Sequence, residues 1–282
     1  MGAAPRARPH VIVYFSGVDP RLADAIGPHP CAGLLSTFAA QKPALDLLSG
    51  ARRNGWHAFL DSGAFSAFNE GEQINVEDYA DFLDRHGRSF DLVASLDVIG
   101  DPDATARNFL RLCERGHDYV VPTFHYSFRW DALDRLCAAS PRIALGGMAR
   151  FARTVTNRKP LRSWLDAAFR RIPRGTLVHG FGVSGLDMLM SYPWDSVDST
   201  TASWGLKRGF VLTGRGGNVR MTMFSNLKSL TIAERLASGA SFKDFDGTRL
   251  RKQSASHAPV TVANARAILS VAEGLTAHRG VA

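Results

Sequence analysis

Asp61, Asp97 and Asp198 each follow directly on a short apolar run that predicts a buried strand. A carboxylate at the point where a strand runs out into a loop is held by the strand and opened to a substrate by the loop. Carboxylates in that setting act as nucleophiles or as general acids and bases. Taken singly, each aspartate has an ordinary alternative as a turn former or helix N-cap. The chemistry therefore depends on whether the three side chains meet.

Polar and small residues recur at the ends of the other apolar runs. If these ends converge on one mouth, the aspartates share a pocket with glycines whose backbone N–H groups a flat ligand can approach. We therefore predict one site built from several loops. Besides the three aspartates, its expected residues are Ser62, Gly63, Thr123, Phe124, His125, Gly146, Gly147, Met148, Phe181 and Gly182.

Eight apolar runs predict strands, with amphipathic helices between several of them. The alternation predicts a parallel sheet, and eight strands predict a closed (β/α)8 barrel, the TIM barrel. An open doubly wound sheet is the alternative, disfavoured because no Gly-rich phosphate turn follows the first run. The predicted strands are His10–Phe15, Trp56–Leu60, Leu92–Leu96, Tyr119–Phe124, Ile143–Leu145, Leu177–Phe181, Asp195–Val197 and Phe210–Thr213. The predicted helices between them include Val76–His86, Ala104–Arg115, Asp131–Ala139 and Leu161–Arg171.

The chain shows no internal repeat and no linker, which favours a single domain with a barrel core over residues 10–225. Residues 226–282 predict a C-terminal helical and basic extension that closes the barrel and adds surface. It contains a helix over Asn226–Ala237, a polar basic segment over Phe242–His257 and a last helix over Val260–Glu273. With 282 residues, 45% of them hydrophobic, the chain can bury a core without disulfides or metal.

The cysteines and the hydropathy pattern exclude several classes. Cys31, Cys113 and Cys137 are widely spaced and form no CxxC pair, so we expect reduced thiols and no metal site. No apolar run approaches the length of a membrane span, and no signal-peptide pattern follows the basic N-terminus. We expect a cytoplasmic protein with no cofactor.

The net charge of +8 is distributed unevenly. Residues 1–149 carry 14 Lys and Arg against 18 Asp and Glu, whereas residues 150–282 carry 20 against 8. Arginine outnumbers lysine 28 to 6, and its guanidinium suits bidentate phosphate contacts. We predict a nucleic-acid partner, with an ordinary solvated basic surface as the alternative. The expected contact residues are Arg150, Arg153, Arg158, Lys207, Arg208, Arg215 and Arg220.

Five short segments resemble, in the same order, motifs of the tRNA-guanine transglycosylases. Asp61-Ser-Gly-Ala-Phe65 resembles their Asp-Ser-Gly-Gly-Phe motif, and Ser95-Leu-Asp97 resembles their guanine-reading aspartate segment. Leu145-Gly-Gly-Met148 resembles their Gly-Gly-Leu turn, Phe181-Gly-Val183 their Met-Gly-Val segment, and Val197-Asp-Ser199 their Phe-Asp-Cys nucleophile motif. The resemblance covers about residues 56–205 and implies a (β/α)8 barrel that exchanges bases.

The resemblance also implies roles. Asp198 would attack C1′ of a guanosine and form a covalent glycosyl-enzyme intermediate. Asp61 would protonate the departing base and deprotonate the incoming one, and Asp97 would accept hydrogen bonds from guanine N1 and N2. Gly146 and Gly147 would donate to the guanine carbonyl, while Phe181 and Phe124 would stack on its ring.

The chain also departs from the tRNA enzymes. Their C-terminal zinc-binding cysteines have no counterpart, and Thr123-Phe-His125 stands where they have a glutamine. Thr200–Trp204 replaces their Pro-Thr-Arg after the nucleophile. This short, zinc-free pattern is similar to the branch that inserts 7-deazaguanine bases such as preQ0 into DNA in phages and some bacteria.

Three other functions stay open beside a DNA-guanine transglycosylase. The first is base exchange in tRNA, and the second is a catalytically silent barrel that binds nucleic acid. Retention of all three aspartates argues against that loss of catalysis. The third is an unrelated barrel hydrolase with paired carboxylates, which would need no basic half.

Overall fold

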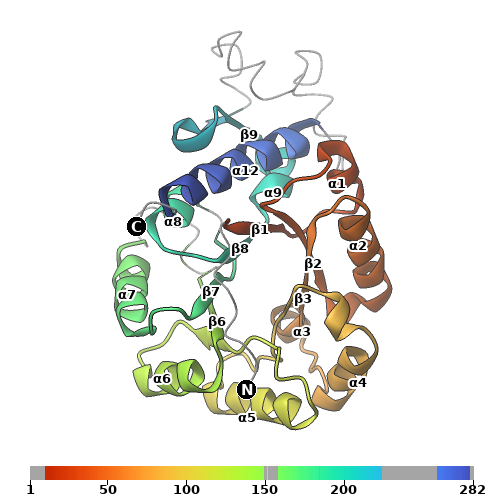
Figure 1. The fold of residues 1–282 in the computed structure, drawn as a ribbon, viewed down its shortest axis with the longest axis vertical. Coiled ribbons are helices and arrows are strands. Elements are labelled where there is room, and N and C mark those ends of the chain that lie inside the picture. Colours follow the sequence, from red (N-terminus) through yellow and green to blue (C-terminus); the bar gives the residue numbers. More distant parts are fainter. Residues whose placement is uncertain (1–9, 149–150, 152–157, 184, 224–258, 280–282) are drawn as a thin grey trace.

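In a computed structural model of the chain, which describes residues 10–148, 151, 158–183, 185–223 and 259–279, eight parallel strands form one curled sheet that alternates with helices. Figure 1 shows the strands around a central axis and the helices outside them. The strands are β1 Ile12–Phe15, β2 Ala32–Thr37, β3 His57–Asp61, β4 Leu92–Val93, β5 Thr123–His125, β6 Arg142–Gly146, β7 Leu177–Gly180 and β8 Ser196–Ser199.

The strand order is β4-β3-β2-β1-β8-β7-β6-β5, so each strand lies beside its neighbours in the sequence and β1 pairs with β8. That order excludes the doubly wound alternative, in which the strand order reverses at a switch point. Between the two end strands, Ala94 and Val121 form an isolated parallel bridge. Ser95 N–H donates to Val121 O at 2.9 Å, and Val121 N–H donates to Val93 O at 2.8 Å.

Two of the strand predictions need correction. Residues Ala32–Thr37 form β2, which the sequence pattern did not reveal, because Gly33, Ser36 and Thr37 interrupt its apolar run. Phe210–Thr213 does form a strand, β9, but it pairs antiparallel with β10 (Arg220–Met223) in a separate hairpin. The other seven predicted runs each supply a strand of the curled sheet.

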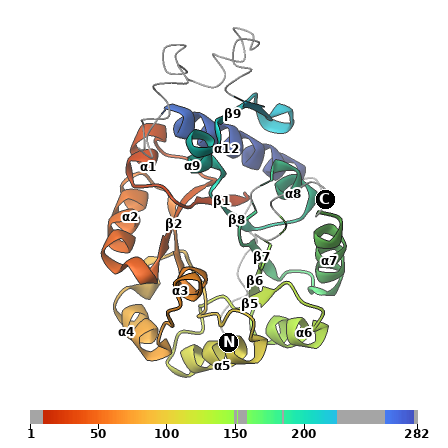
Figure 2. The ribbon, with the colours of Figure 1, turned by 180° about the vertical axis from the view of Figure 1, so that it is seen from behind.

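The helices form a ring around the sheet, and Figure 2 shows this ring from behind, with α3 (Ala64–Glu70) drawn inside it next to β3. They are α1 Arg21–Ile26, α2 Gln41–Arg53, α3 Ala64–Glu70, α4 Val76–His86, α5 Pro102–Glu114, α6 Trp130–Ala139, α7 Arg158–Arg171, α8 Leu186–Ser191, α9 Thr201–Arg208 and α12 Pro259–Arg279. Short 3-10 turns span Phe38–Ala40, Gly87–Ser89 and Gly216–Asn218. The four internal helices predicted from the sequence are confirmed to within a turn.

Local sequence explains where several helices begin. Asn75 caps α4 by accepting from Glu77 N–H at 2.7 Å, and Asp101 caps α5 by accepting from Ala104 N–H at 2.8 Å. Pro102 then opens α5, where a missing N–H costs nothing.

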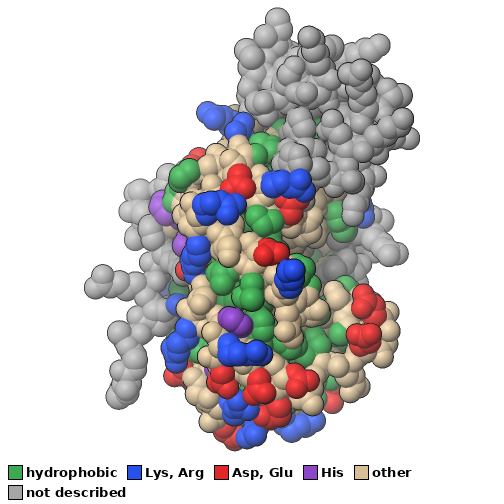
Figure 3. All heavy atoms as spheres, turned by 90° about the vertical axis from the view of Figure 1, so that its right-hand side faces the viewer, with side chains coloured by type: hydrophobic (Ala, Val, Ile, Leu, Met, Phe, Trp, Pro, Cys, Tyr) green, Lys and Arg blue, Asp and Glu red, His purple; other side chains and the backbone are tan. Residues whose placement is uncertain are grey.

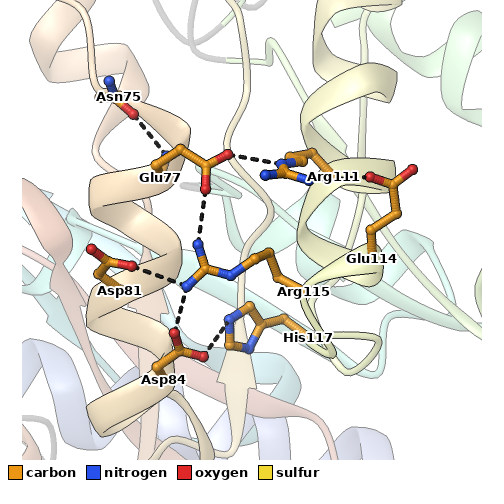
Figure 4. A network of polar contacts seen from close by, with 8 residues as sticks. All are labelled: Asn75, Glu77, Asp81, Asp84, Arg111, Glu114, Arg115 and His117. Atoms are coloured by element: carbon orange, nitrogen blue, oxygen red, sulfur yellow. Dashed lines mark hydrogen bonds and ion pairs between the residues drawn. The ribbon is translucent and has the colours of Figure 1, made fainter.

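A network of ion pairs joins α4 to α5 and to the turn after it (Figure 4). Arg115 reaches Glu77 at 2.8 Å, Asp81 at 3.0 Å and Asp84 at 2.6 Å, while Arg111 pairs with Glu77 at 2.8 Å. These acids are 43–62% exposed, so water screens each pair and the network contributes little to stability.

Alternate residues along each strand face opposite sides, which gives the sheet two apolar layers. Outward residues such as Val13 and Val197 belong to the large core shared with the helices. Inward residues make a small cluster of Ile12, Tyr14, Phe59 and Ala94, with Phe181 packed against it. Inward residues at the carboxyl ends of the strands are mostly polar, and these form the site.

The last helix belongs to the helical ring. α12 packs against α1, α8, α9 and β1, and Val260, Ala263 and Ala265 on it are buried. The β9–β10 hairpin packs on the outer side of α12, and Asn264 Oδ1 accepts from Leu212 N–H at 2.6 Å. Residues 226–258, including the predicted helix Asn226–Ala237, lie outside the described residues. No helix among those described is long and apolar enough to cross a membrane.

Candidate active site

The carboxyl ends of β3, β4 and β8 bring Asp61, Asp97 and Asp198 together. Asp61 is the last residue of β3, Asp97 lies four residues beyond β4, and Asp198 is the third residue of β8. The carboxyl group of Asp61 senses the charges of both other aspartates. The strand ends therefore place three acids in one electrostatic environment, which is the arrangement that their positions in the sequence predicted.

Asp61 has the properties of a proton-transfer group. Burial raises its pKa to about 7, and the charges of Asp97 and Asp198 act in the same direction. Hydrogen bonds from the N–H groups of Gly63 and Ser62 oppose this shift without cancelling it. A carboxyl group with a pKa near neutrality can both give and take a proton at the pH of a cell.

Gly63 shapes the turn that follows Asp61. Its φ of 82° is left-handed, and a Cβ atom there would collide with the hydroxyl of Thr37 at the end of β2. The next residue starts α3, whose first N–H, from Ala64, donates to Ser62 Oγ at 3.4 Å. A side chain at residue 63 would disturb both the turn and the site wall.

Asp97, which follows β4, and His125, at the end of β5, form a pair between adjacent segments. His125 Nε2 lies 3.1 Å from Asp97 Oδ2. Burial lowers the pKa of His125, but the hydrogen bond and charge of Asp97, together with the charge of Asp61, outweigh it and raise that pKa overall. Gly146 makes room for this ring, because a Cβ atom there would lie 3.0 Å from His125 Nδ1. The other oxygen, Asp97 Oδ1, is buried without a hydrogen-bond partner in the described structure.

Asp198 is fixed by one of its two oxygens. It is 8% exposed, and Oδ1 accepts the N–H of Gly182 at 2.7 Å. Gly182 has a left-handed φ of 67°, which turns that N–H toward the end of β8. Among the described residues, Oδ2 has no hydrogen-bond partner. One oxygen is thus anchored and the other is available to react.

Buried hydroxyls at the same end of the sheet lack partners as well. Ser16 follows β1, Thr37 ends β2, Ser95 follows β4 and Thr123 begins β5. Each side-chain oxygen is buried with no hydrogen-bond partner among the residues described. Buried polar groups are normally hydrogen-bonded, so unpartnered ones on an inner face suit a site that receives a polar ligand. Alternation along the strands places Ser16, Thr37 and Thr123 on the inner face, whereas Ser95 has the outward parity of Val93.

Ser16, Thr37 and Ser95 were not assigned to the site from the sequence, and the buried His179 was noted at the end of a predicted strand without a role. Thr37 was missed because β2 was missed. Ser16 follows directly on the first apolar run, which is the same signal that identified the aspartates. His179 lies two residues before Phe181 in the predicted strand Leu177–Phe181, and period two places both side chains on the same face.

The predicted aromatic and glycine residues divide between the site and the core. Phe181 faces the inside, with its ring centre 5.7 Å from that of Phe59. Phe124 faces outward and stacks on Trp164 at 5.8 Å, and Met148 is buried in the same outer core. The expectation that Phe124 and Met148 contact a ligand at the strand ends is therefore corrected. Gly147 is exposed with a φ of 76° beside Tyr126.

The predicted basic residues do not form one described surface. Arg158 donates to both carboxylate oxygens of Asp187 at 2.8 Å, and Arg208 lies 4.2 Å from the ring centre of Trp204. Arg215 and Arg220 are exposed in or beside the β9–β10 hairpin, not at a strand end of the curled sheet. Figure 3 shows cationic and anionic side chains intermingled over the face of α1, α2 and α4. Outside the described residues or side chains lie Arg150, Arg153 and Lys207.

No family model matches the chain, and no curated protein matches it.

Cys31, Cys113 and Cys137 are free thiols in the structure, and burial raises the pKa of each. Among the described side chains, no group of three or more His, Cys, Asp or Glu residues is arranged to hold a metal ion.

Proposed function

We propose that this protein is a guanine transglycosylase that replaces guanine in DNA by a 7-deazaguanine base such as preQ0. The observation that carries the proposal is the pairing of two unlike carboxyl groups: Asp61, with a pKa raised to about 7, and Asp198, anchored by one oxygen. The order of the transglycosylase-like motifs along the chain supports the same reaction. In this proposal the curled sheet is a closed (β/α)8 barrel, supported by the backbone hydrogen bonds between β4 and the segment before β5.

The first half of the proposed reaction removes guanine. Asp198 Oδ2 forms a bond to C1′ of the sugar while the bond from C1′ to guanine N9 breaks. The electron pair leaves with guanine, and Asp61 supplies a proton to it. The second half reverses these steps with the incoming base, which returns a proton to Asp61 as it displaces the carboxylate.

Recognition of the base rests on the remaining polar groups of the mouth. Asp97 Oδ1, which is buried and has no partner among the described residues, suits the N–H donors of a guanine edge. Thr123 belongs to β5, Gly146 ends β6 and Gly147 follows it, so these residues would supply the other polar contacts to the base. A guanine can reach them only after it leaves the base stack. We place the reaction in the cytoplasm of a bacterial cell or of a phage-infected host.

Exchange of labelled guanine tests the proposal. The purified protein is incubated with radiolabelled guanine or preQ0 and with either double-stranded DNA or unmodified tRNA. We expect label in DNA, released by digestion as a deoxynucleoside and identified by mass spectrometry. Label in tRNA alone would replace the DNA proposal by the tRNA alternative.

The Asp198→Asn variant is the matched control, since the amide keeps the shape of the side chain and removes the nucleophile. Binding of DNA without any exchange by the wild-type protein would favour a catalytically silent barrel. Cleavage of a glycosidic bond without uptake of a base would favour a hydrolase.

A further inference from the structure

A buried histidine that the proposed reaction does not yet use lies beside Asp198. His179 is 3% exposed and belongs to β7. The register of the sheet sets its Cα opposite that of Ser196 in β8. Asp198 lies two residues further along β8 and therefore projects from the same face. Strand pairing alone thus places His179 within reach of both side chains.

The imidazole of His179 is held in one orientation. Its Nδ1 lies 2.9 Å from Ser196 Oγ. Edge-on aromatic rings surround it, with centres at 4.8 Å for Phe59, 4.8 Å for Phe181 and 6.1 Å for Tyr14. Turning the ring would break the hydrogen bond to Ser196 and disturb this packing.

The surroundings also select the position of the ring proton. His179 Nε2 lies 3.6 Å from Asp198 Oδ1 and has no hydrogen-bond partner among the described residues. A bare Nε2 lone pair would face the carboxylate oxygen and repel it. When Ser196 donates to Nδ1, the proton of the neutral ring resides on Nε2 and points at Asp198.

At 3.6 Å the contact with Asp198 is longer than a hydrogen bond. Hydrogen bonds between catalytic groups are often long in a protein without substrate and shorten in the complex. The same oxygen, Oδ1, already accepts from Gly182 N–H at 2.7 Å. A second donor on Oδ1 would add to this anchor and leave Oδ2 free to react.

We infer that His179, oriented by Ser196, is a positioning residue that donates from Nε2 to Asp198 Oδ1 during base exchange; this role rests on the proposed function. In the first step Oδ2 bonds to C1′ and the carboxylate loses its negative charge. In the second step the incoming base bonds to C1′, the bond from C1′ to Oδ2 breaks, and its electron pair returns to Asp198. A donor on Oδ1 favours the charged carboxylate, so it accelerates this second step.

Three variants separate positioning from packing. His179→Phe keeps a buried ring without its N–H, His179→Gln keeps an N–H donor close to the position of Nε2, and Ser196→Ala removes the group that orients the ring. For His179→Phe we expect kcat about ten-fold lower, an apparent KM for DNA that falls with it, and a larger steady-state fraction of covalent adduct, because only the second step is slowed. His179→Gln should recover most of the rate, and Ser196→Ala should lie between the two.

A His179→Phe variant with the kcat and the adduct fraction of the wild type would overturn the inference. Failure of His179→Gln to exceed His179→Phe would also overturn it, because packing would then explain the loss. Thermal unfolding of each variant shows that it is folded at the assay temperature.

Nitrogen NMR of the His179 ring supplies a measurement that needs no turnover. In the free wild-type protein we expect the proton on Nε2, and a changed Nε2 signal in Asp198→Asn. A ring protonated on Nδ1 alone, or an Nε2 signal indifferent to Asp198→Asn, would contradict the inference. A protein that shows the expected NMR signals without exchanging bases would instead remove the proposed reaction and leave the pairing of His179 with Asp198.

Discussion

Aspartates occur at both ends of the curled sheet, but their surroundings differ between the two ends. At the amino end, Asp91 precedes β4 and Asp195 precedes β8, and each carboxylate accepts an N–H from the neighbouring strand: Ala58 at 2.9 Å and Val178 at 2.8 Å. Asp91 also pairs with Arg52 at 2.8 Å. Burial works to raise the pKa of Asp91, but the hydrogen bonds from His57 and Ala58 and the charge of Arg52 hold it well below its usual range.

At the carboxyl end of the sheet, the aspartates lie close enough to affect one another's charge, and no arginine pairs with them among the described residues. Asp61 has its pKa raised to about 7 by burial and by two like charges, and Asp97 keeps one buried oxygen without a partner in the described structure. A carboxylate with hydrogen-bond and charge partners stabilises the fold, whereas a buried carboxylate without them lowers stability. Groups of the second kind are therefore common at functional sites. The contrast separates structural from functional aspartates on one sheet.

The largest expected effect comes from removing the proposed nucleophile. Asp198→Asn should abolish exchange of labelled guanine, a loss of many powers of ten, because no covalent intermediate can form. DNA binding should stay within a few-fold of the wild type, as measured by fluorescence anisotropy. Asp195→Asn is the matched control at the other end of β8 and should retain exchange. Near-normal exchange by Asp198→Asn would remove the covalent role of Asp198.

Asp61→Asn should lower exchange by about 10²- to 10⁴-fold, the usual contribution of a general acid and base. In the wild-type protein, removal of guanine needs Asp61 protonated, so single-turnover cleavage should slow as pH rises above about 7. The variant should lose this dependence on pH. A wild-type rate that stays level from pH 6 to about 9 would contradict the assignment of Asp61 as the acid.

The stability of the two ends should respond to pH with opposite signs. The pKa of Asp61 is about 7 in the folded protein and 3.8 as an ordinary aspartate, so the folded state binds the proton more tightly. Its contribution to stability is therefore present at low pH and lost as pH rises from about 4 to about 7. The pKa of Asp91 is lowered, so its contribution is present above 3.8 and lost as pH falls.

Urea unfolding at pH 8 measures this difference. Asp61→Asn should raise the free energy of unfolding by about 1 to 3 kcal/mol, because a buried, mutually repelled charge is removed. Asp91→Asn should lower it by about 1 to 3 kcal/mol, because charge-assisted hydrogen bonds are lost. If both variants were destabilised equally, the two ends would not differ in the proposed way.

The smallest expected effect concerns phosphate contacts. Arg215 is exposed beside the β9–β10 hairpin, whereas Arg158 is engaged by Asp187. If Arg215 contacts phosphate, Arg215→Ala should reduce the slope of log affinity for DNA against log salt by about one unit. Arg158→Ala should change thermal stability and leave that slope unaltered. An unchanged slope for Arg215→Ala would place the DNA elsewhere on the surface.

Much of the fold and of the candidate site could be predicted from the sequence, because apolar runs with polar residues at their ends are typical of the strands of a parallel α/β sheet. Asp61, Asp97, His125, Phe181 and Asp198 were found through that pattern, and the structure places them at one end of the sheet. Backbone pairing sets these positions, so strand ends alone sufficed to find them.

Features that depend on tertiary packing could not be predicted in the same way. β2 has a weak apolar pattern, and β9 has a strong one yet pairs outside the curled sheet. Phe124 alternates with two site residues, Thr123 and His125, and period two places its ring in the outer core. The ring proton of His179 depends on Ser196 in another strand, which only the register of β7 with β8 reveals.

The most direct test of the central claim is to locate the covalent adduct. The protein is mixed with DNA without an incoming base, quenched in acid, digested with protease and nuclease, and its peptides are sequenced by mass spectrometry. We expect a deoxyribosyl adduct on Asp198, absent from Asp198→Asn and more abundant in His179→Phe. An adduct on Asp61 or Asp97, or exchange without any adduct on Asp198, would contradict the account.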